Sequence, residues 1–390
     1  MLIAVFMLKR VFTIIISAVA VLFFVACGGD KGFDVSQFDQ LIYQPKYATG
    51  FDIRYSEQSG ATLITSRNPW QGAEGVVHRL LIDPQGAYAT LREEGVQRIE
   101  ASARRVVCMS SSYVAMLSQI GCEQTLVGVS GIDFISNEWV QSNRTKVGDV
   151  GYDGNTNYEL LLSLNPDIVL LYGVNASNAI ENKLRELNIP YAYIGEYVES
   201  SPLGKAEWMV ALGEIVGHRE RAEKEFSAIR EQYEAVKKLI GERVGEERPM
   251  VMLNTPYRDA WVIPAKNSYM VRLIEDAGAV THSIENQGNS SQPIDLEQAL
   301  LYAHNSDLWL NVGSCGSIEE LVGQNPKFKD VEAVRRGLVY NNTGRQTAGG
   351  GSDFWESGVV RPDRVLMDLC RIFHPELLPE HELYYYKRLR

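Results

Sequence analysis

The chain has 390 residues, of which 45% are hydrophobic and 22% are charged, as in a globular protein long enough for two or three domains. Its formal net charge is −11 at pH 7, which argues against a nucleic-acid-binding protein because such proteins present a basic face. HExxH, GxSxG, GxGxxG, a Walker A loop and CxxC pairs are all absent, so the sequence offers no familiar catalytic or zinc motif.

The first 26 residues are predicted to be a signal peptide. Lys9 and Arg10 precede the apolar run "VFTIIISAVAVLFFVA", and Cys27 follows it. The stretch "FVAC" resembles the lipobox of bacterial lipoproteins, and this resemblance implies that Cys27 is lipidated and anchors the mature chain in the cell envelope, in a membrane that the sequence does not identify. The alternative is a transmembrane anchor, although sixteen apolar residues are slightly short for a span.

Residues 27–46 are predicted to be the lipidated N-terminus and a tether, because they contain few apolar residues. Residues 47–103 are predicted to form a small β module. Within it, "FDIRYS" and "ATLITS" alternate apolar and polar residues on either side of the turn "EQSG", and "GVVHRLLI" supplies a further strand.

From residue 104 to 202, short apolar strand-like runs alternate with helical patterns, which indicates a parallel sheet in an α/β lobe. Residues 203–246 are rich in helix formers. Apolar residues recur there every three or four positions from Ala222 to Ile240, which predicts a helix of about 25 residues, roughly 35 Å long. The βα alternation returns over residues 247–390. The expected fold is therefore α/β, with two doubly wound lobes joined by one long helix and preceded by the β module.

Six stretches in this order resemble the class III periplasmic substrate-binding proteins of ABC importers, which carry ferric siderophores, haem or cobalamin. They are "RRVVCMSSSYVAMLSQIG", "NYELLLSLNPDIVLL", "ALGEIVGHRERAEKEF", "SYMVRLIEDAGA", "DLEQALLYAHNSDLWL" and "VEAVRRGLVYN". The resemblance covers about residues 104–378. It implies a non-enzymatic protein that captures an iron chelate, or alternatively cobalamin, as cargo and delivers it to an ABC permease. The β module lies outside this pattern, and its role is left open.

Open α/β sheets bind ligands beyond the carboxyl ends of their strands, so the loops that follow strands supply the candidate ligand-binding residues. The candidates are Ser111, Ser112, Tyr113, Asp149, Tyr152 and Tyr172 in the first lobe, and Tyr257, Arg258, Trp261, Arg345, Phe354 and Trp355 in the second. Structural roles are equally good explanations for some of these residues. A serine of the run from Ser110 to Ser112 can cap a helix, and Arg258 can be an ordinary surface arginine.

The glycine-rich loop from Thr343 to Gly358 follows the last predicted strand and holds two adjacent aromatic residues. Phe354 and Trp355 either line an apolar pocket wall or pack beneath the last helix. We expect them to divide these tasks, with one ring in the core and Trp355 facing the ligand.

Two glutamates are expected to dock the permease. The resemblance implies one acidic docking residue in each lobe, and the matching positions are Glu159 in "NYELL" and Glu297 in "DLEQAL". Both residues begin helices, where the helix dipole alone favours a carboxylate, and this is the alternative explanation.

Cys108, Cys122, Cys315 and Cys370 allow three disulfide pairings, and burial as free thiols is the favoured expectation.

Two other function classes remain open. A secreted hydrolase using Cys315 in "GSCGS" needs a positioned base, which no pattern marks. A surface protein that binds a partner through the β module is the third class. Direct coordination of bare zinc or manganese is disfavoured because the strand-end loops contain no histidine.

Overall fold

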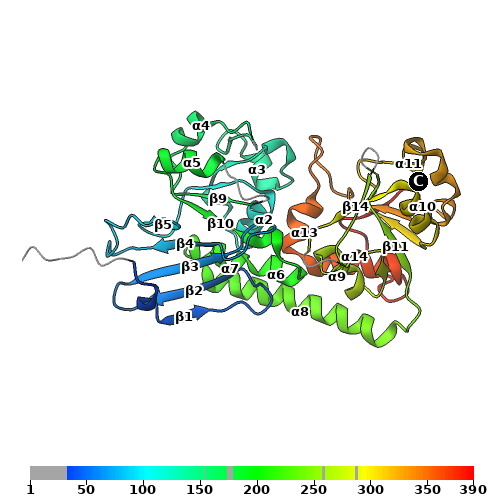
Figure 1. The fold of residues 1–390 in the computed structure, drawn as a ribbon, viewed down its shortest axis with the longest axis horizontal. Coiled ribbons are helices and arrows are strands. Elements are labelled where there is room, and N and C mark those ends of the chain that lie inside the picture. Colours follow the sequence, from blue (N-terminus) through cyan, green and yellow to red (C-terminus); the bar gives the residue numbers. More distant parts are fainter. Residues whose placement is uncertain (1–32, 153, 174–178, 257–259, 286–288) are drawn as a thin grey trace, which may run out of the picture.

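The computed structural model describes residues 33–152, 154–173, 179–256, 260–285 and 289–390. The predicted signal peptide and Cys27 therefore lie outside the described residues. Figure 1 shows two α/β lobes side by side, an N-terminal sheet against the first lobe, and one long helix running along both lobes. Within these described ranges, no helix combines the length and the hydropathy needed to cross a membrane.

The N-terminal sheet has five strands in sequence order, antiparallel except for the last pair. They are β1 (Gln40–Tyr43), β2 (Phe51–Ser56), β3 (Ala61–Arg67), β4 (Val77–Ile82) and β5 (Val96–Ile99). The hairpin predicted around "EQSG" is confirmed as β2 and β3. The prediction of a tether over residues 27–46 is wrong for Gln40–Tyr43, because this segment pairs with the free edge of β2.

This sheet packs directly on the first lobe. Ile64 and Leu80 lie in the same apolar cluster as Val106 of the first lobe. The Ser66 hydroxyl donates a hydrogen bond of 2.8 Å to the carbonyl oxygen of Tyr193. The β module thus extends the core of the first lobe and is not held by a tether alone.

Two buried glutamates fasten the chain between β1 and β2 to the helical linker. The Glu207 carboxylate, 1% exposed, accepts hydrogen bonds of 2.7–2.9 Å from the backbone N–H groups of residues 46–48. The Glu199 carboxylate accepts 2.8–3.0 Å bonds from the N–H groups of residues 49–50 and one of 3.1 Å from the Trp208 indole. Five consecutive backbone donors are therefore satisfied by two buried charges.

The first lobe contains a wholly parallel sheet in the order β10-β9-β6-β7-β8. Its strands are β6 (Val106–Cys108), β7 (Leu126–Val129), β8 (Gly148–Asp149), β9 (Ile168–Leu171) and β10 (Tyr191–Tyr193). Its helices are α2 (Ser111–Gln119), α3 (Glu138–Ser142), α4 (Tyr158–Ser163) and α5 (Ala179–Glu186). The predicted βα alternation is confirmed.

The linker consists of α6 (Pro202–Glu207), α7 (Met209–Ile215) and α8 (Arg219–Arg243). The buried residues of α8 are Ala222, Phe226, Ile229, Tyr233, Val236 and Ile240, the stripe predicted from the sequence. This stripe packs on α7 and on α14 (Pro362–Phe373) of the second lobe, so one helix surface holds both lobes (Figure 1).

The second lobe has a sheet in the order β13-β11-β15-β16-β17, parallel except for the last strand, and a separate hairpin of β12 and β14. Its strands are β11 (Met250–Leu253), β12 (Ala260–Ile263), β13 (Val280–Thr281), β14 (Gln292–Asp295), β15 (Leu308–Leu310), β16 (Val339–Asn341) and β17 (Lys387–Arg388). Its other helices are α9 (Tyr269–Asp276), α10 (Leu296–His304), α11 (Ile318–Gln324), α12 (Glu332–Arg335) and α13 (Ser357–Val360).

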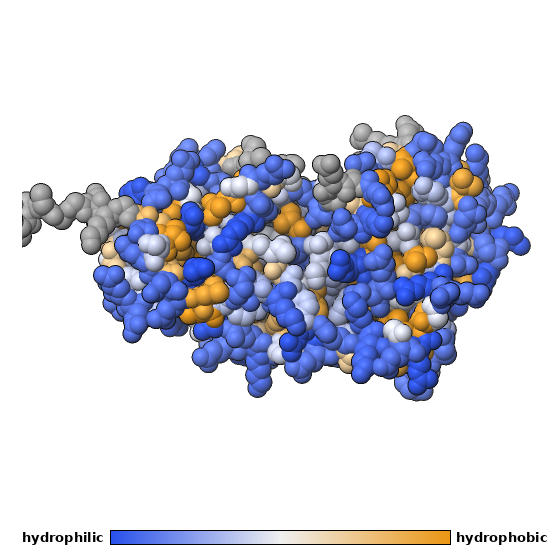
Figure 2. Space-filling model, turned by 60° about the horizontal axis from the view of Figure 1, so that its bottom comes forward, coloured by the Kyte–Doolittle hydropathy of each residue, from blue (hydrophilic) through white to orange (hydrophobic). Residues whose placement is uncertain are grey.

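The face of the molecule seen in Figure 2 is mostly hydrophilic, and its apolar residues gather in separate patches. This distribution fits the acidic composition and the charged outer face of α8.

Replacing Glu207 tests the fastening of the N-terminal sheet. Glu207→Gln removes the charge and one of the two acceptor oxygens, so we expect the free energy of unfolding to fall by about 2–4 kcal/mol. Urea unfolding at pH 7 measures the loss. The control Glu231→Gln, on the exposed face of α8, should change stability by less than about 0.5 kcal/mol. A Glu207→Gln protein as stable as the wild type would contradict this account.

Candidate functional site

A cavity of about 590 Å³ lies between the two lobes. The first lobe lines it with the loops after β6 and β9, and the second lobe lines it with the loops after β11 and β15 and the start of α9. Its wall includes Ser110, Ser111, Ser112, Tyr172, Glu196, Glu199, Lys205, Asn254, Ser268, Tyr269, Met270, Asn289, Asn311 and Trp355. This volume lies within the range of small-molecule sites.

The topology of each sheet explains the position of the cavity. In the first lobe β6 lies between β7 and β9, so the chain leaves this central strand in one direction and later returns on its other side. In the second lobe β11 lies between β13 and β15 in the same way. Loops diverge at such switch points and leave a crevice at the carboxyl ends of the strands. The two crevices together form the cleft.

A buried ion pair forms part of the cleft floor. Glu196 and Lys205 are 4% and 6% exposed, and the Lys205 ammonium lies 2.9 Å from a Glu196 carboxylate oxygen. Lys205 also donates a 2.8 Å hydrogen bond to the Glu196 carbonyl oxygen, and the Ser112 hydroxyl donates one of 2.8 Å to the carboxylate. The lysine charge is therefore matched inside the protein and is not left free for an anionic ligand.

Two asparagines with left-handed backbone conformations follow neighbouring strands of the second lobe. Asn254 has φ 65° and Asn311 has φ 60°, and each comes directly after a strand of the pair β11 and β15. Asparagine tolerates this region better than most residues, but such positions still store backbone strain, which gathers at functional sites. Both residues line the cleft.

The two adjacent aromatic residues of the glycine-rich loop point in different directions. They belong to the short 3-10 helix η6 (Asp353–Trp355). Phe354 is 1% exposed, whereas Trp355 is 52% exposed and lines the cleft. The two rings pack edge to face, with their centroids 4.7 Å apart. The expected division between core and cleft is thus found, and the candidate ligand role of Phe354 is wrong. Contact of Trp355 with a ligand stays a prediction.

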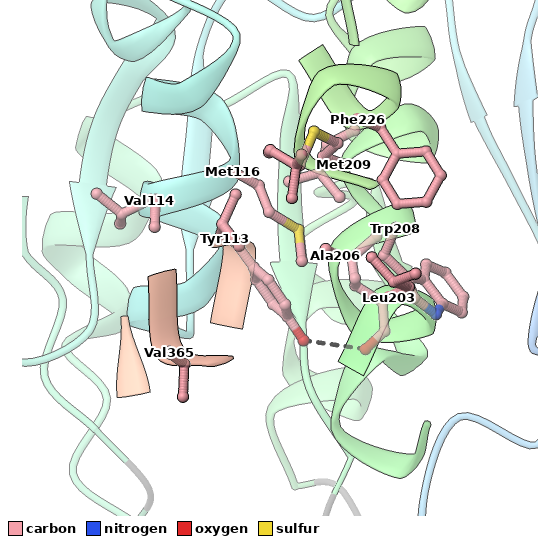
Figure 3. Close-up of a cluster of buried hydrophobic side chains, with 14 of the residues drawn as sticks. Tyr113, Val114, Met116, Leu203, Ala206, Trp208, Met209, Phe226 and Val365 are labelled. Atoms are coloured by element: carbon pink, nitrogen blue, oxygen red, sulfur yellow. Dashed lines mark hydrogen bonds between the residues drawn. The ribbon is translucent and has the colours of Figure 1, made fainter. Parts of the chain in front are cut away.

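Two other candidates are core residues. Tyr113 is 0% exposed and its hydroxyl donates a 3.0 Å hydrogen bond to the Ile194 carbonyl oxygen, because it lies on the inner face of α2 (Figure 3). Trp261 is also 0% exposed. Its indole donates to the Leu253 carbonyl oxygen at 2.8 Å, and its ring stacks on Trp309 because this side of β12 faces the core. The predictions that they face the ligand are wrong.

Three further candidates do not line the cleft. The Asp149 carboxylate accepts hydrogen bonds from the backbone N–H groups of Gly131 and Gly151 and so joins the loops that follow β7 and β8. Tyr152 is 56% exposed on the surface. Arg345 pairs with Asp353 at 2.9 Å and lines a different cavity. All three residues lie at or after the end of a strand, but none of these three side chains reaches the cleft wall.

The remaining candidates divide into two groups. Ser111, Ser112 and Tyr172 line the cleft, although the Ser112 hydroxyl is already bonded to Glu196. Tyr257 and Arg258 lie outside the described residues.

Sequence reasoning missed Glu196, Lys205, Tyr269 and Asn311. Glu196 and Asn311 follow the strands β10 and β15, so the strand-end rule that selected the other candidates also applies to them. Lys205 and Tyr269 lie in helices, and only the packing of α6 and α9 together brings them to the cleft.

The glycine-rich loop also contacts the first lobe. A Cβ atom on Gly351 would overlap the Phe134 carbonyl oxygen, and one on Gly349 would lie 2.5 Å from that of Asp133. The Thr347 hydroxyl donates a 2.8 Å hydrogen bond to the Asp133 carbonyl oxygen. The glycines thus permit the close approach of two backbones from different lobes.

Glu356 forms a second contact between the lobes. Its carboxylate accepts a 2.6 Å hydrogen bond from the Ser136 N–H group, and the side chain lies in a polar cavity of about 510 Å³ shared by both lobes. Burial raises the pKa of Glu356 to about 8, and the N–H of Ser136 only partly offsets this effect.

The four cysteines of the described residues are buried thiols. Cys108, Cys122, Cys315 and Cys370 are free and buried, as expected. Burial, followed by the Glu320 charge, raises the pKa of the Cys315 thiol, which opposes the thiolate that a nucleophile requires. Among the residues that the structure describes, no group of three His, Cys, Asp or Glu side chains is placed to hold a metal ion.

Glu159 and Glu297 occupy equivalent positions in the two lobes. Each is exposed in the first turn of its helix, α4 or α10. The caps of these helices are Asn157 and Asp295, so neither glutamate is needed as a cap. Both side chains are accessible to a partner.

Comparison with known proteins identifies similar chains. Residues 106–344 match the family described as periplasmic binding protein. An uncharacterized lipoprotein of Methanocaldococcus jannaschii is 24% identical over 366 residues, which cover 87% of this chain and 84% of that protein. A second uncharacterized lipoprotein of the same organism is 26% identical over 63% of this chain and 62% of its own length.

Solved structures share the fold. A periplasmic haem-binding protein from Pseudomonas aeruginosa superposes with a TM-score of 0.54 at 19% identity, covering 70% of this chain and 94% of that one. A periplasmic vitamin B12 binding protein of Vibrio cholerae gives 0.52 at 14% identity, with coverage of 70% and 96%. The two-lobed fold is therefore that of periplasmic binding proteins.

The raised pKa of Glu356 predicts a pH-dependent effect of removing its charge. Between its ordinary value of 4.5 and about 8, the carboxyl ionises in the unfolded chain but stays protonated in the folded one, so stability falls as pH rises through this window. Glu356→Gln mimics the protonated form. Its melting temperature should equal that of the wild type near pH 4.5 and exceed it at pH 8. An equal difference at both pH values, or a less stable variant at pH 8, would contradict the assignment.

Proposed function

The chain belongs to the periplasmic binding protein family, and on that premise we propose that it captures a metal chelate in the cleft and delivers it to an ABC permease. The chelate is an iron chelate, such as a ferric siderophore or haem, or alternatively cobalamin. The observation that carries the proposal is the 590 Å³ cavity at the switch points of both sheets, lined by hydroxyl, amide and aromatic side chains.

The comparisons support this ligand class. Similar folds are found in proteins named for haem binding and for vitamin B12 binding. In this proposal the chelate is cargo and not a resident cofactor.

We also propose that the chain is lipid-anchored through Cys27 in the cell envelope. Two relatives are named as lipoproteins, and the "FVAC" stretch supports the same placement. Acyl chains would keep the binding lobes near the membrane that contains the permease.

Docking on the permease would use Glu159 and Glu297. The support for this is their exposure, their equivalent places in the two lobes and the presence of separate caps for their helices. Charged pairs at such a contact mainly set orientation and association rate.

Ligand titration tests the proposal. Haem, a ferric siderophore and cobalamin each quench tryptophan fluorescence when bound nearby, and we expect one of them to bind. Trp355→Ala should weaken binding by about 1–3 kcal/mol and leave the melting temperature nearly unchanged, because the ring is half exposed. Phe354→Ala in the same 3-10 helix is the contrast and should lower stability by about 3–5 kcal/mol. Wild-type affinity together with a large stability loss in Trp355→Ala would reverse the two roles.

Transport assays test the docking residues. The double variant Glu159→Lys, Glu297→Lys should abolish uptake of the bound chelate while leaving its affinity intact. Glu138→Lys with Glu319→Lys is a matched control, because these exposed glutamates begin α3 and α11. Normal transport by the first pair, or an equal loss in the control, would refute the docking assignment.

A further inference from the structure

Three polar atoms on the second-lobe side of the cleft have no direct hydrogen-bond partner in the part of the chain that the structure describes. They are the Ser268 hydroxyl oxygen, the Tyr269 hydroxyl oxygen and the amide oxygen of Asn311, and all three are buried. The three residues line the same cavity, and Asn311 as a whole is only 9% exposed. Proteins satisfy nearly all of their buried polar groups, so unpartnered polar atoms on several residues of one cavity indicate that a ligand completes some of them.

An internal partner exists for one of the three. The Tyr386 hydroxyl is also buried without a partner, and Asn311 is near enough to lower the pKa that burial raises at Tyr386. A turn of the Asn311 amide would therefore satisfy both groups. No such partner is found for Ser268 and Tyr269 among the described residues, and Tyr386 does not line the cleft, which makes it a useful control.

The chemistry of these atoms selects a kind of ligand group. The Ser268 and Tyr269 hydroxyls can each donate and accept a hydrogen bond. Burial raises the pKa of Tyr269, so its phenol keeps its proton and remains a donor. An amide offers a carbonyl acceptor and an N–H donor in one planar group, which matches this set.

The charges around the cavity also favour an uncharged ligand group. The charged side chains among its described lining residues are Glu196, Glu199 and Lys205, and the lysine is already paired with Glu196. This part of the wall therefore carries a formal charge of −1 and offers no unpaired cation. A carboxylate entering it would lose its hydration without gaining a partner.

We propose that Ser268 and Tyr269 form a subsite for an uncharged amide group, so that the cleft takes an amide-bearing chelate in preference to one whose rim carries carboxylates. This inference rests on the proposed function. Both hydroxyls are buried and have no protein partner among the described residues, so a ligand that displaces the neighbouring side chains gains their hydrogen bonds without first displacing bulk water.

A matched pair of corrinoids tests the inference. Cobinamide carries amide side chains around its ring, whereas cobyrinic acid carries carboxylates at the same positions. Ferrioxamine B, an amide-bearing ferric hydroxamate, and haem, which has two carboxylates and no amide, form a second pair. We expect the amide-bearing member of one pair to bind at least about tenfold more tightly than its partner. The pair that shows this difference in affinity identifies the chelate that carries the amide, either a corrinoid or a ferric hydroxamate.

Variants separate this subsite from a structural role. Tyr269→Phe and Ser268→Ala should each weaken binding of the amide-bearing chelate about three- to tenfold and leave the melting temperature of the empty protein unchanged, because the hydroxyls have no protein partner to lose. Tyr386→Phe should leave affinity unchanged. Wild-type affinity in Tyr269→Phe, or tighter binding of the carboxylate-bearing members, would overturn this inference and leave the proposed function intact. Failure of all four chelates to bind would overturn this inference, whereas the proposed function is decided separately by the titrations of haem, a ferric siderophore and cobalamin described above.

Discussion

The cleft depends on the packing of one helix. Two parallel sheets form a shared binding site only if their carboxyl edges are held facing each other, and the buried stripe of α8 packs on α7 and α14 to provide this. A continuous helix of 25 residues is stiffer than a pair of extended strands, so it limits how far the lobes can separate. The glycine-rich loop and Glu356 add two further contacts between the lobes. We infer that the lobes move modestly around a ligand and that the cleft is largely formed before binding.

The N-terminal sheet also supports the cleft. Glu199 lines the cleft and also binds the backbone at Thr49 and Gly50, so one carboxylate joins the floor of the binding site to the segment before β2. Glu207 holds the preceding residues in the same way. A binding role for this sheet is unnecessary to explain its position. Its apolar contacts and these two glutamates make it a structural support that packs on the first lobe.

Much of the fold was predictable because its signals are local. The stripe from Ala222 to Ile240 and the hairpin around "EQSG" depend on periodicity and turn residues, and both are found as expected. The site was predictable only in part, because a strand-end position shows which end of the sheet a residue occupies but not where its side chain points. Tyr113 follows β6 and yet faces the core, and Trp261 lies inside β12 with its ring also in the core. Tyr269 and Lys205 lie in helices and not at strand ends, and they meet only because helices that are distant in sequence pack together.

The central claim is that a chelate binds between the lobes and not on the outer surface of either. Amide hydrogen exchange of the full protein, with and without a saturating chelate, tests it most directly. The account predicts that protection rises in the loops after β6, β9, β11 and β15 and around Tyr269 and Trp355, while the N-terminal sheet is unchanged. Protection confined to the N-terminal sheet or to the outer helices, with the cleft loops exchanging as in the free protein, would contradict it.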